Sequence, residues 1–196
     1  MVIRTTFEAE LGRLHDEVLM LGSMVEKAIG RSVDALRRLD HAEARLVIQG
    51  DHEINAKRFA IEEQAVQLMA TQQPIARDLR SIVAALNIIV DLERMGDHAE
   101  GIAKIVLMHQ DVPLLKPLVD IPRMSDLARD MLRRSLDAYI QRDVTAARAI
   151  AESDDAVDHL YEQVYSELIG LMVHDPTTFD RATWLMWVSH NLERCA

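Results

Sequence analysis

Apolar residues recur at intervals of three and four positions along almost the whole chain, which is the spacing of one face of an α-helix. The five prolines fall only where this periodicity breaks, as expected because a proline inside a helix loses a hydrogen bond and clashes with the preceding turn. In the third periodic segment the apolar stripe consists of Ala85, Ile88, Leu92, Met95, Ala99, Ile102 and Val106. The pattern predicts an all-α fold with six helices, over residues 6–38, 42–69, 75–108, 121–141, 144–173 and 178–196.

The two halves of the chain repeat each other. The triplet Leu92-Glu93-Arg94 returns 100 positions later as Leu192-Glu193-Arg194. Short connections make neighbouring helices run antiparallel, so the duplication predicts two tandem antiparallel three-helix bundles, in residues 1–110 and 123–196, joined by a linker at 111–122. Further upstream, ten residues of the first half have identical counterparts 103 positions later: Arg31, Ser32, Asp34, Ala35, Asp40, Ala44, Arg45, Asp51, Leu68 and Met69.

Composition and charge narrow the range of partners and locations. The net charge is −10 and the basic residues form no long run, which weighs against nucleic acid as the main partner because phosphate binding needs a basic surface. A single cysteine, Cys195, excludes an internal disulfide, and the N-terminus does not read as a signal peptide, so we expect a cytoplasmic protein. The most apolar stretch, residues 82–90, is about half the length that a membrane-spanning helix needs, so we expect no membrane span.

Acidic residues stand four apart in both halves, a spacing that places them side by side on a helix face. Glu93 and Asp97 project away from the apolar stripe of the third helix. Oxygen ligands from two neighbouring helices would suit a hard cation such as Mg²⁺ or Mn²⁺, with iron also possible. A solvated acidic face is the alternative interpretation. The candidate metal ligands of the two halves are Asp51, Asn55, Glu93, Asp97, Asp154, Asp158 and Glu193.

The third helix is also apolar on its back face. Val83, Leu86 and Val90 lie there, and a helix that is apolar all round is buried on more than one side. We expect this face to meet the other bundle, a second subunit or a partner protein. Arg94 is the fourth residue that we expect to take part in this contact. A purely structural dimerisation module is one hypothesis that follows.

Signatures of catalysis are missing from the sequence. It contains no Gly-rich phosphate loop, no Ser or Cys nucleophile motif and no Glu-x-x-His pair of the di-iron type. We therefore predict a binding and regulatory protein without enzymatic activity. The competing hypothesis is a metal-dependent enzyme or metal-binding helical bundle that uses the same carboxylates.

Two motifs resemble one known family. The stretch Gln73-Pro74-Ile75-Ala76-Arg77-Asp78-Leu79-Arg80, followed by Asp91-Leu92-Glu93-Arg94-Met95-Gly96-Asp97-His98, resembles the hallmark of the PhoU family of phosphate-transport regulators. Asp175-Pro176 and Asn191-Leu192-Glu193-Arg194-Cys195-Ala196 resemble the same signature in the second half. The likeness covers nearly the whole chain.

This resemblance implies a cytoplasmic, non-enzymatic protein of two similar three-helix bundles, often a homodimer. Proteins of the family act between the phosphate-specific ABC transporter, through its ATPase subunit, and a sensor histidine kinase, and they repress the phosphate-starvation response when phosphate is plentiful. Some members bind metal clusters through Glu/Asp-x-x-x-Asp motifs. By position, the first-half motif falls on Glu93 and Asp97, with Asp51 and Asn55 on the neighbouring helix, and the second half offers Asp154, Asp158 and Glu193. The last Asp of the second motif would follow Ala196, where the sequence ends, so we expect that half to offer an incomplete metal site.

Overall fold

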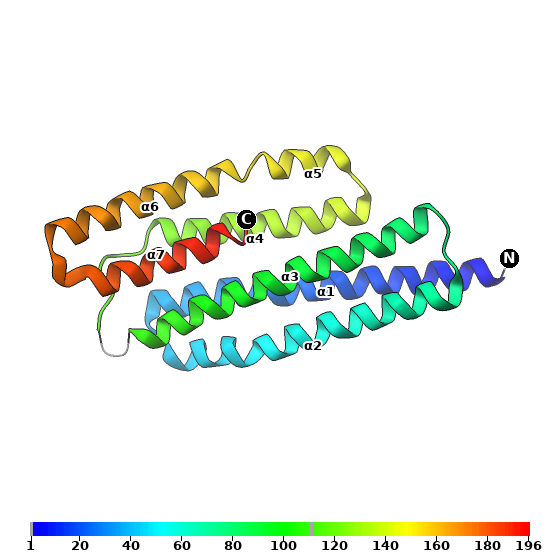
Figure 1. Cartoon of the computed structure of the whole chain (residues 1–196), viewed down its shortest axis with the longest axis horizontal. Coiled ribbons are helices and arrows are strands. Elements are labelled where there is room, and N and C mark those ends of the chain that lie inside the picture. The colour runs from blue at the N-terminus through cyan, green and yellow to red at the C-terminus, as the bar shows by residue number, and fades with distance from the viewer. Residues whose placement is uncertain (1, 110–111) are drawn as a thin grey trace.

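Two antiparallel helical bundles lie side by side in this computed structural model, which describes residues 2–109 and 112–196, the side chains of residues 2–5 excepted (Figure 1). The first bundle consists of α1 (Val2–Arg38), α2 (His41–Gln72) and α3 (Arg77–Met108). The second bundle consists of α4 (Asp120–Gln141), α5 (Val144–Ala151), α6 (Asp155–His174), the short 3₁₀ helix η1 (Pro176–Thr178) and α7 (Phe179–Glu193). The described residues contain no strand, and the predicted all-α fold with repeated halves is confirmed.

Both halves turn their first corner in the same way. The Asp40 carboxylate accepts hydrogen bonds from two backbone N–H groups in the first turn of α2, at 3.1 and 3.0 Å, and Asp143 accepts one at the start of α5, at 2.9 Å. Each aspartate satisfies N–H groups that have no partner inside the helix. The residues before them, Leu39 and Arg142, both adopt left-handed backbone conformations with φ of 51° and 57°. The duplication in sequence is therefore a duplication of helix-capping geometry.

The prediction of one continuous helix over residues 144–173 is wrong. The structure has two helices there, α5 and α6, with a break between them. The Ser153 hydroxyl donates to the Ile150 carbonyl at 2.6 Å, and the Ser153 N–H bonds the same carbonyl at 2.9 Å. Both bonds reach three residues back, whereas an α-helical N–H bonds the carbonyl four residues back. The serine side chain competes with the helix for backbone groups and so favours this tighter turn. Apolar periodicity did not reveal the break because Ile150 and Val157 stay in phase and are both buried.

Contacts of α1 with α4 and of α3 with α7 join the two bundles, and we call these contacts the bundle joint. A Cβ atom on Gly22 would collide with the Leu136 side chain, so the glycine lets α4 approach the α1 backbone closely. Two members of the predicted α3 stripe, Ile88 and Met95, are only half-buried and line a groove beside the joint. The other five members are buried in the first bundle as predicted.

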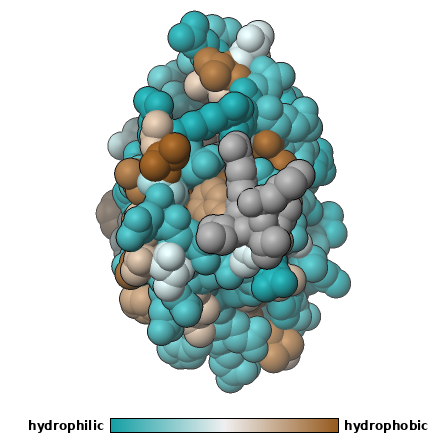
Figure 2. All heavy atoms as spheres, turned by 90° about the vertical axis from the view of Figure 1, so that its right-hand side faces the viewer, coloured by the Kyte–Doolittle hydropathy of each residue, from teal (hydrophilic) through white to brown (hydrophobic). Residues whose placement is uncertain are grey.

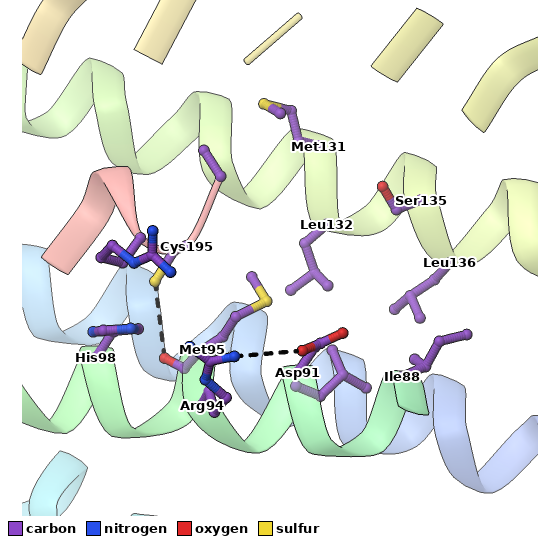
Figure 3. A pocket seen from close by; sticks show the side chains of 13 residues that line it. Ile88, Asp91, Arg94, Met95, His98, Met131, Leu132, Ser135, Leu136 and Cys195 are labelled. Carbon is purple, nitrogen blue, oxygen red and sulfur yellow. Dashed lines mark hydrogen bonds and ion pairs between the residues drawn. The ribbon is translucent and has the colours of Figure 1, made fainter. Parts of the chain in front are cut away.

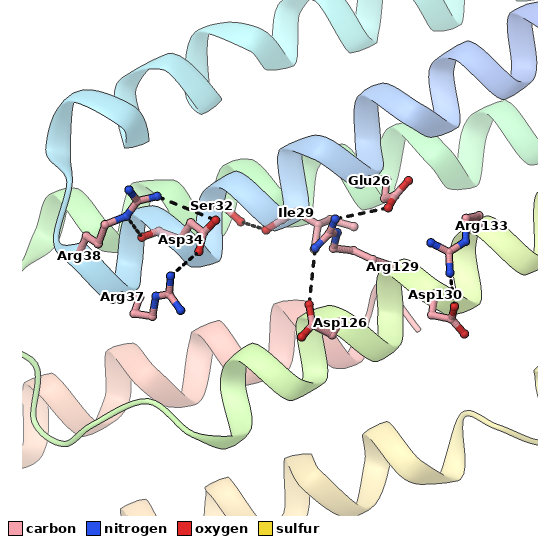
Figure 4. A network of polar contacts seen from close by, with 10 residues as sticks. All are labelled: Glu26, Ile29, Ser32, Asp34, Arg37, Arg38, Asp126, Arg129, Asp130 and Arg133. Atoms are coloured by element: carbon pink, nitrogen blue, oxygen red, sulfur yellow. Dashed lines mark hydrogen bonds and ion pairs between the residues drawn. The ribbon is translucent and has the colours of Figure 1, made fainter.

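Charged side chains also cross the joint. Arg129 of α4 pairs with Glu26 of α1 at 3.4 Å and with Asp126 of its own helix at 3.6 Å (Figure 4). Its guanidinium group lies against Gly30, where a Cβ atom would be 3.2 Å away. Partly exposed ion pairs contribute at most about 1 kcal/mol. Arg129 therefore fixes how the helices align more than it stabilises the docked state.

The described helices include none that is long and apolar enough to span a membrane. The end of the molecule that holds the α2–α3 and α4–α5 turns is mostly covered by hydrophilic residues, with hydrophobic ones in separate spots (Figure 2). Ile75 and Val144, in or next to these turns, are 78% and 64% exposed. The hydrophobic residues that the coloured part of this view shows therefore form separate spots and no single apolar surface.

Candidate functional site

Asp51 is the buried centre of the acidic residues on the first bundle. Only 8% of its surface is exposed. Its Oδ2 atom accepts a hydrogen bond of 2.7 Å from the Asn55 amide, one turn further along α2. Its Oδ1 atom is buried and has no hydrogen-bond partner in the described part of the chain. A buried carboxylate oxygen without a partner is costly, so this atom is suited to a ligand.

Gly96 of α3 makes room beside this carboxylate. A Cβ atom at position 96 would lie 3.1 Å from the Ile54 side chain and 3.6 Å from the Asp51 Oδ1 atom. The bare glycine therefore lets α2 approach α3 closely beside the Asp51 carboxylate. Sequence reasoning missed this residue, although a glycine inside a helix and within the acidic motif was a usable signal.

Neighbouring carboxylates surround Asp51 with negative charge. Burial raises the pKa of Asp51, and the charges of Glu100, Asp97 and Glu93 raise it further, while His52 lowers it. Within residues 2–109 and 112–196 neither Glu93, which is half-buried, nor Asp97, which is exposed, has an ion-pair partner. A cation placed among these groups would relieve their mutual repulsion.

Glu100 belongs to the same surface and was not among the predicted ligands. It pairs with Lys104 at 2.5 Å, so its charge is already partly neutralised. Its spacing of three from Asp97 continues the helix face and was visible in the sequence. We call the first-bundle set the acidic site. Its members are Asp51, Asn55, Glu93, Asp97 and Glu100.

The acidic site offers the type of ligand atom that a hard cation prefers. All are carboxylate or amide oxygens, which suit Mg²⁺, Mn²⁺ or iron, and the Asp51 Oδ1 atom lacks any other partner. As the side chains are positioned, no three His, Cys, Asp or Glu residues in the described ranges stand close enough together to hold one metal ion. Binding would therefore require Glu93 and Asp97 to change rotamer.

The counterpart residues in the second bundle do not form an equivalent site. Asp154 is half-buried at the break between α5 and α6, and Asp158 is exposed. Burial raises the pKa of Asp154, as do Asp158 and Asp155. Glu193 lies 3.5 Å from the His190 ring nitrogen and is not among the charges that act on Asp154. The structure therefore brings together Asp154 and Asp158, whereas the contact it shows for Glu193 is with His190 of its own helix.

A groove of about 400 Å³ lies where α3, α4 and the end of α7 meet (Figure 3). Its walls are mainly apolar, with Met95 and Leu136 on opposite sides. The His98 ring donates from Nδ1 to the Asn191 side-chain oxygen at 2.9 Å. Burial raises the pKa of the Cys195 thiol to about 12, so this sulfur stays protonated at neutral pH and is a poor nucleophile.

Most of the chain matches one known protein family. A family model described as the PhoU domain matches residues 18–106 and 121–196, which together cover most of both bundles. The chain belongs to the PhoU family. Proteins named phosphate-specific transport system accessory protein PhoU homolog resemble it closely. The one from Clostridium acetobutylicum is 37% identical and aligns over 97% of this chain and 88% of its own length, and the one from Aquifex aeolicus is 37% identical over 94% and 84%.

Solved PhoU structures share the fold. The crystal structure of PhoU from Pseudomonas aeruginosa matches with a TM-score of 0.91 and 31% identity, over 96% of this chain and 91% of that one. The crystal structure of the phosphate transport system regulatory protein PhoU from Streptococcus pneumoniae matches with a TM-score of 0.89 and 33% identity, over 96% and 89%. The resemblance inferred from the two sequence motifs is confirmed.

This PhoU-family chain also exposes an apolar surface next to the acidic site. Val83 and Val90 are 44% and 38% exposed, so the second bundle, one of the three expected neighbours of this face, does not cover them. Leu86 is half-buried against the core. Phe59 and Val66 of α2 are 61% and 53% exposed. We call Phe59, Val66, Val83, Leu86 and Val90 the α2–α3 flank.

The register of the two helices places these residues opposite one another. Ile54 packs on Gly96 and α2 runs antiparallel to α3, so Phe59 lies about level with Val90 and Val66 about level with Val83. Arg94, which we had grouped with this face, is mostly exposed, pairs weakly with Asp91 at 3.9 Å and lines the groove between the bundles instead.

Proposed function

We propose that this PhoU-family chain is a regulator of phosphate uptake, a cytoplasmic helical adaptor between a phosphate ABC transporter and a sensor histidine kinase. It acts by surface contacts without catalysing a reaction, and it represses the phosphate-starvation response when phosphate is plentiful. Family membership and the names of its relatives support the link to phosphate transport. The proposed kinase contact and the proposed direction of regulation rest on the resemblance of the two sequence motifs to the PhoU family.

The exposed α2–α3 flank is the observation that carries this proposal. Five apolar side chains lie on one surface of the first bundle, and four of them are more than one-third exposed. Exposed apolar surface next to charged residues is typical of protein-interaction sites. The acidic site at one end of the flank would orient a partner through charge, because electrostatic complementarity fixes register and speeds encounter.

Calorimetric titration tests the adaptor role. The chain is titrated with the cytoplasmic part of a phosphate-sensing histidine kinase and, separately, with the ATPase subunit of a phosphate ABC transporter. We expect binding to at least one of them, and loss of that binding in the variant Val83→Glu/Val90→Glu. The matched control is Val144→Glu/Val173→Glu, which changes two exposed valines of the second bundle and should bind normally.

Three results would contradict the proposal. The chain could bind neither protein, or the two variants could bind equally well. A change from dimer to monomer in the flank variant, with partner binding intact, would instead assign the flank to a homodimer contact. Light scattering on both variants distinguishes this outcome.

We also propose that the acidic site binds a divalent cation, with Asp51, Glu93 and Asp97 as the main ligands and Asn55 as a further oxygen donor. The unpartnered Asp51 Oδ1 atom supports this second role. A bound ion would supply positive charge that neutralises the carboxylates and could order them for partner contact. Titration with Mn²⁺ should show binding that Glu93→Gln/Asp97→Asn abolishes. Metal-dependent turnover lost in the same variant would favour the enzyme hypothesis instead.

A further inference from the structure

Two histidines of the first bundle lie in the bundle joint, far apart along its length. The first, His15 of α1, is half-buried. Its Nε2 atom is 3.2 Å from the Ser81 hydroxyl, and its ring meets the Tyr139 ring of α4 edge-on with centroids 5.4 Å apart. Tyr139 in turn donates to the Ser81 carbonyl at 3.3 Å. Arg142, the residue that ends α4, opposes protonation of this ring.

The second histidine, His109, ends α3 and is fully buried. Its Nδ1–H group donates to the Ile105 carbonyl at 3.1 Å, so in the neutral ring Nε2 carries no proton. That Nε2 atom is buried without a hydrogen-bond partner among the described residues. The ring packs on Trp184 of α7 with centroids 4.8 Å apart. The charges of His41 and of Arg181 in α7 oppose protonation of this ring, as Arg142 does at His15.

Both places share one arrangement. In each, a histidine from the first bundle packs against an aromatic ring of the second bundle, and the charge of a second-bundle arginine opposes its protonation. The pairs lie towards opposite ends of the molecule, because Arg142 precedes the α4–α5 turn at one end and Arg181 lies near the start of α7 at the other (Figure 1). Each neutral ring is compatible with close packing, whereas an imidazolium at either place would be desolvated by burial and repelled by the arginine charge.

We propose that the bundle joint is a proton-operated hinge, in which protonation of His15 and His109 separates the two bundles while each bundle keeps its own helices. The separation hydrates both imidazolium groups and removes them from Arg142 and Arg181. The segment between α3 and α4 keeps the bundles connected. Apolar contacts such as Leu136 on Gly22 hold the joint closed when the rings are neutral.

The charged surroundings of both rings give the direction of the effect. Burial is the main cause that lowers the pKa of His15, followed by Arg142, while Asp16 raises it. Burial also lowers the pKa of His109, with further lowering by His41 and Arg181, and the hydrogen bond to Ile105 raises it. A base whose pKa is lowered in the docked state favours docking above its ordinary pKa of 6.5. This contribution to the free energy of docking is lost as the pH falls from 6.5 through the lowered pKa values of the two histidines.

X-ray scattering and fluorescence on the isolated chain test the hinge. A Trp187→Phe background leaves Trp184, the ring against His109, as the only tryptophan. Between pH 7.5 and pH 5.0 we expect the radius of gyration to rise and Trp184 emission to shift to longer wavelength, with unchanged helical circular dichroism. Because the protein is studied alone, the outcome is independent of kinase or transporter binding.

Two histidine variants separate the hinge from general acid effects. His15→Gln/His109→Asn keeps amide groups for the hydrogen bonds but cannot gain a proton, so it should stay docked at both pH values. His159→Gln/His174→Asn changes two exposed histidines of α6 and should open like the unmodified chain. Opening of the first variant, or no opening of the unmodified chain, would overturn the proposal.

A third variant addresses the arginines and covers the case in which His109→Asn fails to fold. Arg142→Gln/Arg181→Gln removes the opposing positive charges and leaves both rings buried. It should open less at pH 5.0 than the unmodified chain, because each protonated ring is then tolerated better in the docked state. Opening equal to or greater than that of the unmodified chain would contradict the proposal.

Discussion

Asp51 and Asp154 occupy equivalent positions in the two halves of this chain, yet their surroundings differ. Asp51 lies within the unbroken helix α2, is 8% exposed and lies against Gly96 of α3. Asp154 lies at the break between α5 and α6 and is half-buried. A hydrogen bond joins Asp51 to Asn55 four residues later, whereas Asp158 is exposed. Equal spacing in the sequence has therefore produced one built site and one loose pair of carboxylates.

The difference shows what a carboxylate pair needs in order to become a site. Helical spacing alone is not enough, because the Asp158 N–H bonds the Asp154 carbonyl at 3.1 Å, so this pair also shares a helix face. The carboxylate must also be buried against a facing helix, as Asp51 is where α2 approaches α3 at Gly96. Four changes should break or sharpen this contrast, in decreasing order of expected effect.

Metal binding should stabilise the first bundle's site far more than the second bundle's residues. At a Mn²⁺ concentration about 100-fold above its dissociation constant, binding to the folded state raises the free energy of unfolding by about 2.7 kcal/mol. Scanning calorimetry with and without Mn²⁺ measures this gain. Asp51→Asn/Asp97→Asn should abolish it, and Asp154→Asn/Asp158→Asn should leave it nearly intact. Equal losses in both variants would show that the two halves bind alike.

Filling the space beside Gly96 should destabilise the first bundle. Gly96→Leu forces a side chain against Ile54 and Asp51, and overpacking of this kind costs roughly 1–3 kcal/mol. Urea unfolding measures the loss. The matched control is Gly170→Leu on α6, where a Cβ atom would meet no described atom within 4 Å. That control should be unchanged or slightly more stable, because leucine favours helix over glycine.

Removing the charge of Asp51 should stabilise the chain at neutral pH. The pKa of this group is raised above 3.8 in the folded state, so its ionised form opposes folding once the pH exceeds about 3.8. Asp51→Asn should therefore raise the free energy of unfolding at pH 7, by on the order of 1 kcal/mol, and have little effect at pH 3.5. Urea unfolding at both pH values checks this. The pKa of Asp154 is also raised, but this group is less buried, so Asp154→Asn should give a smaller gain. A larger gain for Asp154→Asn than for Asp51→Asn would contradict the contrast between the halves.

Repairing the helix break should give the smallest effect. Ser153→Ala removes the hydroxyl that binds the Ile150 carbonyl, and alanine favours helix over serine by about 0.5 kcal/mol. Amide hydrogen exchange over residues 152–157 should slow as α5 and α6 become more continuous. The control Ser166→Ala lies inside α6 and should leave exchange at the break unchanged. If Ser153→Ala does not slow exchange there, serine is not the cause of the break.

The sequence by itself determined the helices, the duplication and the family. Apolar spacing and helix caps are local properties, so the ends of α2, α3 and α4 could be predicted to within a few residues. Four-residue spacing also indicated the first-half candidates, Asp51 with Asn55 and Glu93 with Asp97, and their role as metal ligands stays a prediction. The break at Ser153 was missed because the apolar stripe runs through it in phase.

Only the tertiary structure decided which of these residues are buried and what they face. The unpartnered Oδ1 atom of Asp51 and the exposure of Val83 depend on how helices distant in sequence pack together. The same holds for His15 and His109, which pack against aromatic rings 124 and 75 positions away in the sequence. Periodicity specifies the face of a helix on which a residue lies, whereas burial and pKa depend on the neighbour that covers that face.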